Sequence, residues 1–254
     1  MSFYKSLSDY YDDLFPVAAG EMDFLINQVK GVECLLDIGC GTGNKTILFK
    51  DAAKVVFGID IDHDMLEKAR EKHGAPNVTY VECDLESLDK EFTPEGIDAV
   101  LCLGNVLAHF NSLRRIQSAL IKIGESTSVG GKLIVQILNY DRIIKNRIEE
   151  LPVLETDKVK FMRHTKWHND KIFFLTTLAV KGTGKVYSSN TQFYALTRDE
   201  LEQSLFLAGF EGVKYYGDFD GGPWDEDSFL TLAVAQKFEP LMPLEADGEV
   251  CRLN

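Results

Sequence analysis

The sequence has little positive charge for its size. Its 254 residues include 27 lysines and arginines against 40 aspartates and glutamates, for a formal net charge of −13. Proteins that bind nucleic acid neutralise its phosphates with clusters of Lys and Arg. The nearest approach to such a cluster is Arg114-Arg115, which we interpret as part of the solvated face of a helix. We therefore do not expect nucleic acid as a substrate.

Long apolar segments are also missing. No stretch approaches the roughly 18 apolar residues that a membrane-spanning helix requires. The segment Met1–Tyr10 carries no apolar run behind a basic region, so no secretory signal is predicted. These features predict a protein without membrane contact, and we expect it in the cytoplasm.

Paired cysteines are missing as well. None of the five cysteines forms a C-x-x-C pair, which argues against a zinc knuckle or a redox dithiol. We expect small buried thiols in a reducing compartment. His164 and His168 lie four residues apart on an expected strand and its turn, without a Glu as in H-E-x-x-H. No metal site is therefore predicted.

What the sequence does contain is a regular alternation of apolar, strand-like runs and helical segments. Alternation of this kind indicates a parallel sheet with right-handed crossovers. The strands are expected near 34–38, 55–60, 78–82, 98–103 and 132–138. The helices between them are expected near 43–50, 63–73, 105–110 and 112–124. Two further helices are predicted before the first strand, one on either side of Pro16.

The pattern changes after Asn139. Three runs rich in β-branched and aromatic residues are separated by turn residues, as in β-hairpins; they are 159–167, 172–180 and 185–194. They predict an antiparallel insertion of two or three strands that covers the active-site edge of the sheet. A capping box, Thr197-Arg-Asp-Glu200, then begins a last helix. Strands near 213–219 and 229–237 are expected to follow.

The chain is long enough, with 45% hydrophobic residues, to bury a core without disulfides or metals. We expect a core of residues 1–138 that includes the N-terminal helices, an insertion over 139–194, and a return to the core over 195–238. The tail, 239–254, has scattered acids and two prolines and is expected to be flexible.

The most informative segment is Asp37-Ile-Gly-Cys-Gly-Thr-Gly43, which ends an apolar strand; a second strand then ends in Asp60. This is a mononucleotide-type βαβ unit, in which the ligand binds at the carboxyl ends of the strands. A dinucleotide fingerprint would need a glycine at Asn44, and a P-loop would need Lys directly after Gly43. The loop therefore brings its backbone close to a ligand but lacks the parts that hold a pyrophosphate or a triphosphate.

The glycine motif, followed at this distance by Asp60, resembles the first motif of the class I S-adenosylmethionine-dependent methyltransferases. The resemblance extends from about Leu35 to about Val135. It implies an α/β fold with the Rossmann-like seven-stranded sheet of that family, ending in an antiparallel hairpin and carrying a small antiparallel β insertion. It also implies S-adenosylmethionine as the cofactor and S-adenosylhomocysteine as the product.

The resemblance assigns roles to several acids. Asp60 would accept the ribose hydroxyls, although a carboxylate there could instead cap the helix that starts near Asp62. Asp84 would accept the adenine amino group, or simply stabilise a surface turn. Asp37 would face the methionine end of the cofactor. Tyr11 could fold over the cofactor as part of an N-terminal lid, or could simply pack in the core. The remaining candidates for cofactor binding lie in or beside the same loops; they are Gly39, Cys40, Gly41, Ile61, Leu85 and Leu103.

Two further segments point to the methyl acceptor. Leu103-Gly-Asn-Val-Leu-Ala-His-Phe110 and Leu138-Asn-Tyr-Asp141 are similar to stretches of glycine N-methyltransferases and related small-molecule N-methyltransferases. This similarity implies that the acceptor is bordered by Asn105, His109, Asn139 and Tyr140. Leu138 stands where the animal enzymes have Arg, which leaves acceptance of glycine open.

Two side chains have competing interpretations. His109 could act as a base toward the acceptor or could pack or cap within its helix. Arg163, in the insertion, could pair with a carboxylate of the acceptor or could be a solvated residue on an exposed strand.

The primary hypothesis is an S-adenosylmethionine-dependent methyltransferase for a small-molecule acceptor, with an amine preferred. The alternatives are a small-molecule O-methyltransferase and a non-catalytic S-adenosylmethionine-binding regulatory protein; a nicotinamide enzyme ranks last because the glycine spacing is wrong. The sequence does not name the acceptor or the oligomeric state.

Overall fold

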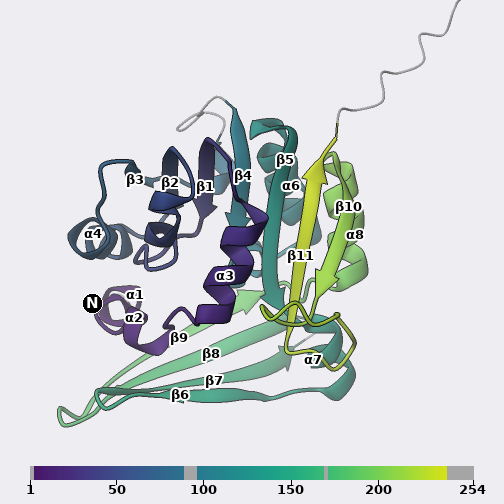
Figure 1. The fold of residues 1–254 in the computed structure, drawn as a ribbon. Helices are drawn as coiled ribbons and strands as arrows, with labels where there is room; N and C mark the ends of the chain where they lie inside the picture. Colours follow the sequence, from purple (N-terminus) through teal and green to yellow (C-terminus); the bar gives the residue numbers. More distant parts are fainter. Residues whose placement is uncertain (1–2, 89–95, 169–170, 239–254) are drawn as a thin grey trace, which may run out of the picture.

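The computed structural model describes residues 3–88, 96–168 and 171–238, so the tail expected to be flexible lies outside the described residues. The chain forms one seven-stranded sheet with helices on both faces and a second, four-stranded sheet across one end of it (Figure 1). The expected α/β fold, a seven-stranded sheet with a small antiparallel insertion, is confirmed.

The large sheet has the strand order β10-β11-β5-β4-β1-β2-β3. Strands β1 to β5 run parallel, and β11 pairs antiparallel with both β5 and β10. Each parallel strand predicted from the sequence is present, as is the closing hairpin. The strands are β1 (Cys34–Ile38), β2 (Val55–Asp60), β3 (Val78–Glu82), β4 (Ile97–Cys102), β5 (Thr127–Leu138), β10 (Phe210–Tyr216) and β11 (Leu230–Lys237).

The α-helices pack on both faces of this sheet or close its edge, and three short 3-10 helices follow strands within the described ranges. The α-helices outside the insertion are α1 (Phe3–Ser8), α2 (Tyr11–Leu14), α3 (Ala19–Gln28), α4 (His63–Lys72), α6 (Leu113–Ser126) and α8 (Arg198–Leu207). The 3-10 helices are η1 (Thr46–Asp51), η2 (Leu85–Ser87) and η3 (Val106–His109). Among the helices of the described ranges, none is both long and apolar enough to cross a membrane.

The core of the protein surrounds the central strand of the large sheet. The central strand β4 is almost wholly buried, because α3 covers one face of the sheet while α6 and α8 cover the other (Figure 1). Strands buried on both faces need continuous apolar runs, and Val100 and Leu101 are both fully buried. Helix α6 contributes an apolar stripe at helical spacing, with Ile116, Leu120 and Ile123 inside.

The insertion is larger than the sequence predicted. Its sheet has four strands in the order β6-β7-β8-β9, which are β6 (Glu150–Glu155), β7 (Val159–His168), β8 (Lys171–Val180) and β9 (Lys185–Phe193). Helix α7 (Tyr140–Asn146) precedes them and was not predicted. Strand β6 was missed because it lies at the sheet edge with only Leu151 buried and contains Pro152, so it lacks a strand signature.

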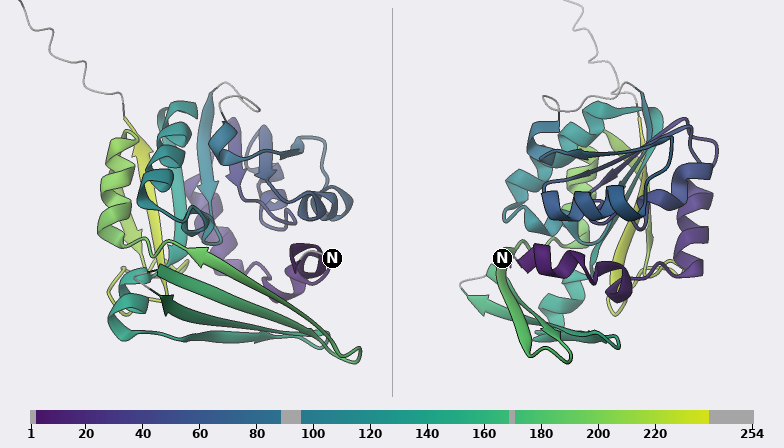
Figure 2. Two further views of the ribbon diagram at one scale, coloured as in Figure 1. Left: turned by 180° about the vertical axis from the view of Figure 1, so that it is seen from behind. Right: turned by 90° about the vertical axis from the view of Figure 1, so that its left-hand side faces the viewer.

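The N-terminal segment lies between the two sheets. Helices α1 and α2 sit above the far end of strands β7 to β9 and beside α4 (Figure 2). Phe161 of β7 packs against this segment, with ring centroids 6.4 Å from Phe3 and 5.9 Å from Phe15. We call residues 3–15, which hold α1 and α2, the lid.

Candidate active site

A cavity of about 410 Å³ opens at the carboxyl ends of the parallel strands. This is the edge at which ligands bind in open α/β sheets, and the volume is that of a small-molecule site. The lid closes one side of it through Tyr4 and Tyr11. Residues from the glycine loop, the ends of β2 and β3, and η3 complete the wall; they include Gly39, Gly41, Asp60, Ile61, Asp84, Leu85, Gly104, Val106 and His109.

The glycine loop has a shape that side chains would prevent. Gly39, Gly41 and Gly43 all have positive φ angles, of 68°, 56° and 74°. A Cβ atom on Gly39 would also collide with Val106, and one on Gly43 with the Tyr80 ring. Two of the three glycines, Gly39 and Gly41, line the cavity, so the loop offers bare backbone to a ligand.

Asp60 ends β2 at the cavity wall. Its Oδ2 accepts a hydrogen bond from the backbone N–H of Gly41 at 2.8 Å, and its Oδ1 accepts one from Asp62 at 2.9 Å. Burial raises the pKa of Asp60 despite these bonds. The alternative helix-capping role falls to Asp62, whose carboxylate accepts from the Met65 N–H. Asp60 therefore remains directed at the glycine loop and the cavity.

Beside Asp60, the cavity wall is formed by the apolar side chain of Ile61 and by a second acid, Asp84. The Ile61 side chain is 70% exposed although it is large and apolar. Asp84, after β3, accepts a hydrogen bond from the Glu86 N–H at 2.9 Å and begins η2. Both residues line the cavity together with Leu85, so this end combines an apolar face with a carboxylate.

Three expected cofactor residues lie behind the wall instead of on it. Asp37 is 3% exposed and accepts a hydrogen bond from the Thr46 hydroxyl at 2.6 Å. Burial raises the pKa of Asp37 to about 6. Cys40 and Leu103 are also buried and do not line the cavity. These side chains support the loops whose neighbouring glycines reach the cavity.

The expected acceptor residues Asn105 and Tyr140 contact each other. Asn105 has a left-handed backbone, with φ of 69°. Its Nδ2 donates to the hydroxyl of Tyr140 at 3.0 Å, and its Oδ1 accepts from the Leu138 N–H at 3.1 Å. Tyr140 is fully buried. The pair joins the carboxyl ends of β4 and β5 rather than lining the cavity.

Asn139 is turned away from the cavity. Its Oδ1 accepts from the Arg142 N–H and so caps α7, while its Nδ2 donates to the carbonyl oxygens of Asp225 at 3.1 Å and Ser228 at 3.0 Å. The side chain is 1% exposed. Its amide holds the loop before β11 against the end of β5.

His109 does lie at the cavity. Its ring meets Phe193 of the insertion edge-on, with centroids 4.4 Å apart. The residue is exposed on the cavity side, but desolvation by the protein atoms around it lowers the pKa of His109, so the imidazole is neutral near pH 7. In the part of the chain that the structure describes, no three His, Cys, Asp or Glu side chains gather as a metal site.

Several lining residues were not predicted from the sequence. They come from the lid, α4, η3 and α6 and are Tyr4, Met65, Val106, Phe110 and Arg115. Arg115 is held by Glu86, with its Nε and Nη2 donating at 2.7 and 2.6 Å. No local pattern marks these positions, because only the fold brings their elements to one edge.

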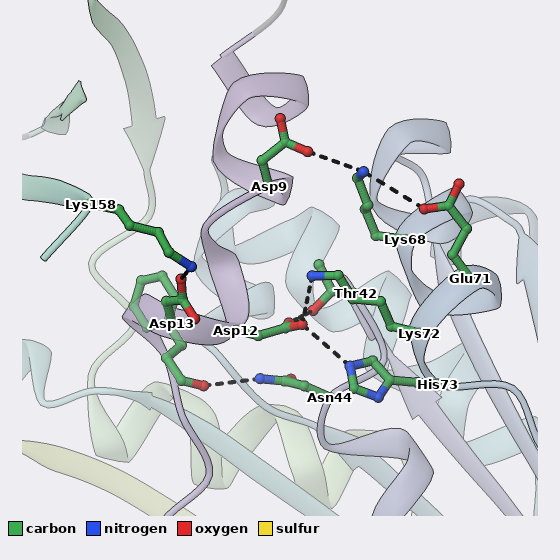
Figure 3. Close-up of polar contacts among 11 residues, drawn as sticks. Asp9, Asp12, Asp13, Thr42, Asn44, Lys68, Glu71, Lys72, His73 and Lys158 are labelled. Atoms are coloured by element: carbon green, nitrogen blue, oxygen red, sulfur yellow. Dashed lines mark hydrogen bonds and ion pairs between the residues drawn. The ribbon is translucent and has the colours of Figure 1, made fainter. Parts of the chain in front are cut away.

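Polar contacts fasten the lid (Figure 3). Asp12 receives hydrogen bonds from the Thr42 hydroxyl at 2.5 Å and from Lys72 Nζ at 3.0 Å, and His73 Nε2 lies 3.3 Å away. Asn44 donates to the carbonyl oxygen of Phe15. The lid is thus tied directly to the glycine loop and to α4.

Comparison with known proteins identifies the kind of domain. Residues 35–131 match a family model described as a methyltransferase domain. Glycine N-methyltransferase of Mus musculus is 32% identical over 126 residues, 45% of this chain and 43% of that protein. The match thus spans less than half of the mouse protein. Glycine/sarcosine N-methyltransferase of Aphanothece halophytica is 25% identical over 234 residues, 87% of this chain and 83% of that protein.

A solved structure agrees in fold. The S-adenosylmethionine-bound amino pentose methyltransferase from Micromonospora echinaspora superposes with a TM-score of 0.71 at 20% identity, covering 93% of this chain and 98% of that one. The similarity therefore extends over both sheets. The resemblance inferred from the glycine motif is confirmed by the domain match and by the fold.

Proposed function

We propose that this protein transfers the methyl group of S-adenosylmethionine to a small-molecule amine. The proposal starts from the family of the chain, the class I S-adenosylmethionine-dependent methyltransferases. The observation that carries this proposal is the joint placement, around one cavity, of the bare glycine loop, Asp60 and a neutral His109. The similar proteins described above include N-methyltransferases for glycine and sarcosine, which supports an amine acceptor.

The residues of the cavity fit the cofactor. A carboxylate at the end of the second strand suits a pair of ribose hydroxyls, and Asp60 keeps lone pairs beyond its two backbone bonds. The exposed Ile61 offers an apolar surface for a flat base, with Asp84 and Leu85 at its edge. When bound, the cofactor supplies an activated methyl group on a sulfonium.

The other task of the protein is positioning. Methyl transfer is an in-line displacement, and orientation of two reactants can contribute about 7–11 kcal/mol. We assign to Asn105 and Tyr140 the fixing of the strand ends beside the cavity, and to Asn139 the fixing of the loop before β11. Tyr4 and Tyr11 of the lid would exclude water from the reacting groups.

His109 would face the acceptor. An amine must be neutral to attack, and a neutral imidazole can accept a hydrogen bond from it. Because the pKa of His109 is lowered, the ring stays neutral over the pH range in which amines lose their proton. The rate is then expected to rise with pH as the acceptor itself deprotonates.

The test is turnover. Purified protein is incubated with S-adenosylmethionine and panels of primary and secondary amines, and S-adenosylhomocysteine is quantified. Formation of S-adenosylhomocysteine that depends on an amine supports the proposal. Tight binding of S-adenosylmethionine without turnover on any amine would instead favour a regulatory binding protein, and turnover on hydroxyl compounds alone would favour an O-methyltransferase.

A further inference from the structure

The inner face of the four-stranded sheet carries polar side chains among buried apolar ones. On β7, Phe161, Arg163 and Thr165 point to the same face because side chains alternate along a strand. Arg163 is paired with Thr176 of β8, and Thr176 with Ser189 of β9. On one side this row of three residues is followed by the apolar pair Phe161 and Leu178, and on the other by Phe174 between two threonines, Thr165 and Thr191. The hydroxyls of Ser189 and Thr191 share a hydrogen bond of 3.3 Å.

Arg163 is the unusual member of the row. Its side chain is half-buried, its Nε has no hydrogen-bond partner, and its Nη2 donates only to the carbonyl oxygen of Pro152 at 2.9 Å. The guanidinium lies 5.7 Å from the centre of the Phe161 ring. Among the described residues no carboxylate forms an ion pair with it, in a chain that carries an excess of 13 acids. Burying a cation in this way is costly unless an anion joins it.

The row lies between the two places where this sheet meets the wall of the cavity. At one end Phe161 contacts Phe15, whose ring centroid lies 4.8 Å from that of Tyr11 in the cavity wall. At the other end Phe193 contacts His109. Arg163 is one step of about 6.6 Å along β7 from Phe161. Arg163, Thr176 and Ser189 do not line the cavity themselves, and the row adjoins its wall through Phe161 and Phe193.

We infer that Arg163, with the hydroxyls of Thr176 and Ser189, forms a subsite for an oxyanion of the methyl acceptor. A guanidinium offers parallel N–H donors that match a carboxylate or a phosphate, and neighbouring hydroxyls can supply further hydrogen bonds. The acceptor would then be an amine that also carries an anionic group, held by its anion at the sheet and by its nitrogen near His109. This inference rests on the proposed function, because it concerns the acceptor of the proposed methyl transfer.

Direct anion binding provides the first test. The midpoint of thermal unfolding is followed in sodium acetate, sodium phosphate and sodium chloride at constant ionic strength, for the free protein and for its S-adenosylhomocysteine complex. Acetate or phosphate, but not chloride, is expected to raise the midpoint of the wild type. Arg163→Gln should weaken this anion binding about tenfold or more, as for the loss of a charged hydrogen bond. Acetate and phosphate then distinguish a carboxylate from a phosphate ligand.

A matched control comes from the same strand. Lys166→Gln removes a positive charge three residues away, on the opposite and exposed face of β7, and should leave anion binding unchanged. Arg163→Lys keeps the charge and should restore part of the binding, and Ser189→Ala tests the row while leaving the arginine in place. Equal anion responses in the wild type, Arg163→Gln and Lys166→Gln would overturn the inference.

Acceptor preference provides the second test. Amino acids are compared with their own amides, which keep the amine and lose the carboxylate. The wild type should prefer the acids through a lower KM, and Arg163→Gln should lose that preference while still turning over the amides. Transfer to the amides and the acids at equal KM in the wild type would contradict the subsite while leaving the methyltransferase proposal intact. Failure to bind S-adenosylmethionine would instead contradict the proposed function, and the anion titration of the free protein would still test Arg163.

Discussion

The side-chain amide of Asn105 donates a hydrogen bond to the buried hydroxyl of Tyr140, and this contact joins the ends of two neighbouring parallel strands beside the cavity. The two residues are far apart in the sequence, yet each lies within three residues of the end of a strand. Asn is one of the few non-glycine residues that adopt a left-handed backbone readily, and both polar atoms of the Asn105 side chain are hydrogen-bonded. The edge of the sheet on which the proposed chemistry depends is therefore braced.

Removal of the Tyr140 hydroxyl tests this brace. Tyr140→Phe leaves the partly buried Nδ2 of Asn105 without an acceptor and should lower the free energy of unfolding by about 1–3 kcal/mol. Denaturant unfolding measures the change. Tyr215→Phe is the matched control, because the Tyr215 hydroxyl is buried without a partner, so its removal should cost little or stabilise. Equal losses in the two variants would show that the contact with Asn105 contributes nothing.

The glycine loop predicts a steric effect. Gly39→Ala places a Cβ against Val106 and forces a positive φ on alanine, so it should lose stability and the binding of S-adenosylmethionine together. Gly182→Ala is the control: Gly182 also has a positive φ, but no atom lies within 4 Å of the added carbon. Its loss of stability, about 1 kcal/mol, therefore measures the cost of the backbone conformation alone. Calorimetric unfolding and titration give both quantities. A Gly39→Ala variant no worse than Gly182→Ala would refute the collision.

The buried Asp37 predicts a dependence of stability on pH. Because its pKa is about 6 in the folded protein and lower in the unfolded chain, the folded state binds more protons between pH 4 and 6. Ionised Asp37 therefore costs stability, and this cost grows as the pH rises through 6, to about 2–3 kcal/mol. Asp37→Asn should lack this component. Unfolding curves from pH 4 to 8 that decline equally in the wild type and the variant would exclude Asp37 as the source.

The lid contacts predict unequal effects of two neighbouring acids. Asp12→Ala removes the contacts with Thr42, Lys72 and His73 and should weaken binding of S-adenosylmethionine about tenfold, because the lid that carries Tyr11 is released. Asp13→Ala removes only an exposed ion pair with Lys158, which is worth about 1 kcal/mol at most. Calorimetric titration of both variants compares them. Similar affinities would mean that the Asp12 contacts do not hold the cofactor site closed.

Much of this fold could be predicted because buried parallel strands have few alternative interpretations. The apolar runs at 34–38 and 55–60 each end at or next to an acid, Asp37 and Asp60, and the structure has β1 and β2 at those positions. The edge strand β6 could not be recognised, since it buries one side chain and contains a proline. Helix α7 is only seven residues long, and its cap, Asn139, lies in a segment whose similarity to N-methyltransferases points to the acceptor and not to a helix start.

The residues of the candidate site also fall into those that the sequence could predict and those that it could not. Residues in the glycine loop and at the strand ends, such as Asp60 and Asp84, could be predicted because topology alone places strand ends together. Tyr4, Met65 and Phe110 could not, because they reach the cavity through the packing of the lid, α4 and η3. Whether a polar side chain faces a ligand or braces the backbone is likewise decided by packing, as Asn105 and Asn139 illustrate.

The most direct test of the central claim is a calorimetric titration of the full chain with S-adenosylmethionine and, separately, with NAD. Micromolar binding of S-adenosylmethionine is expected, and no binding of NAD. Asp60→Ala should weaken binding by about 1–3 kcal/mol, as expected when buried ribose hydroxyls lose their acceptor. Folded wild-type protein that does not bind S-adenosylmethionine, or that binds NAD instead, would contradict the assignment of the cavity.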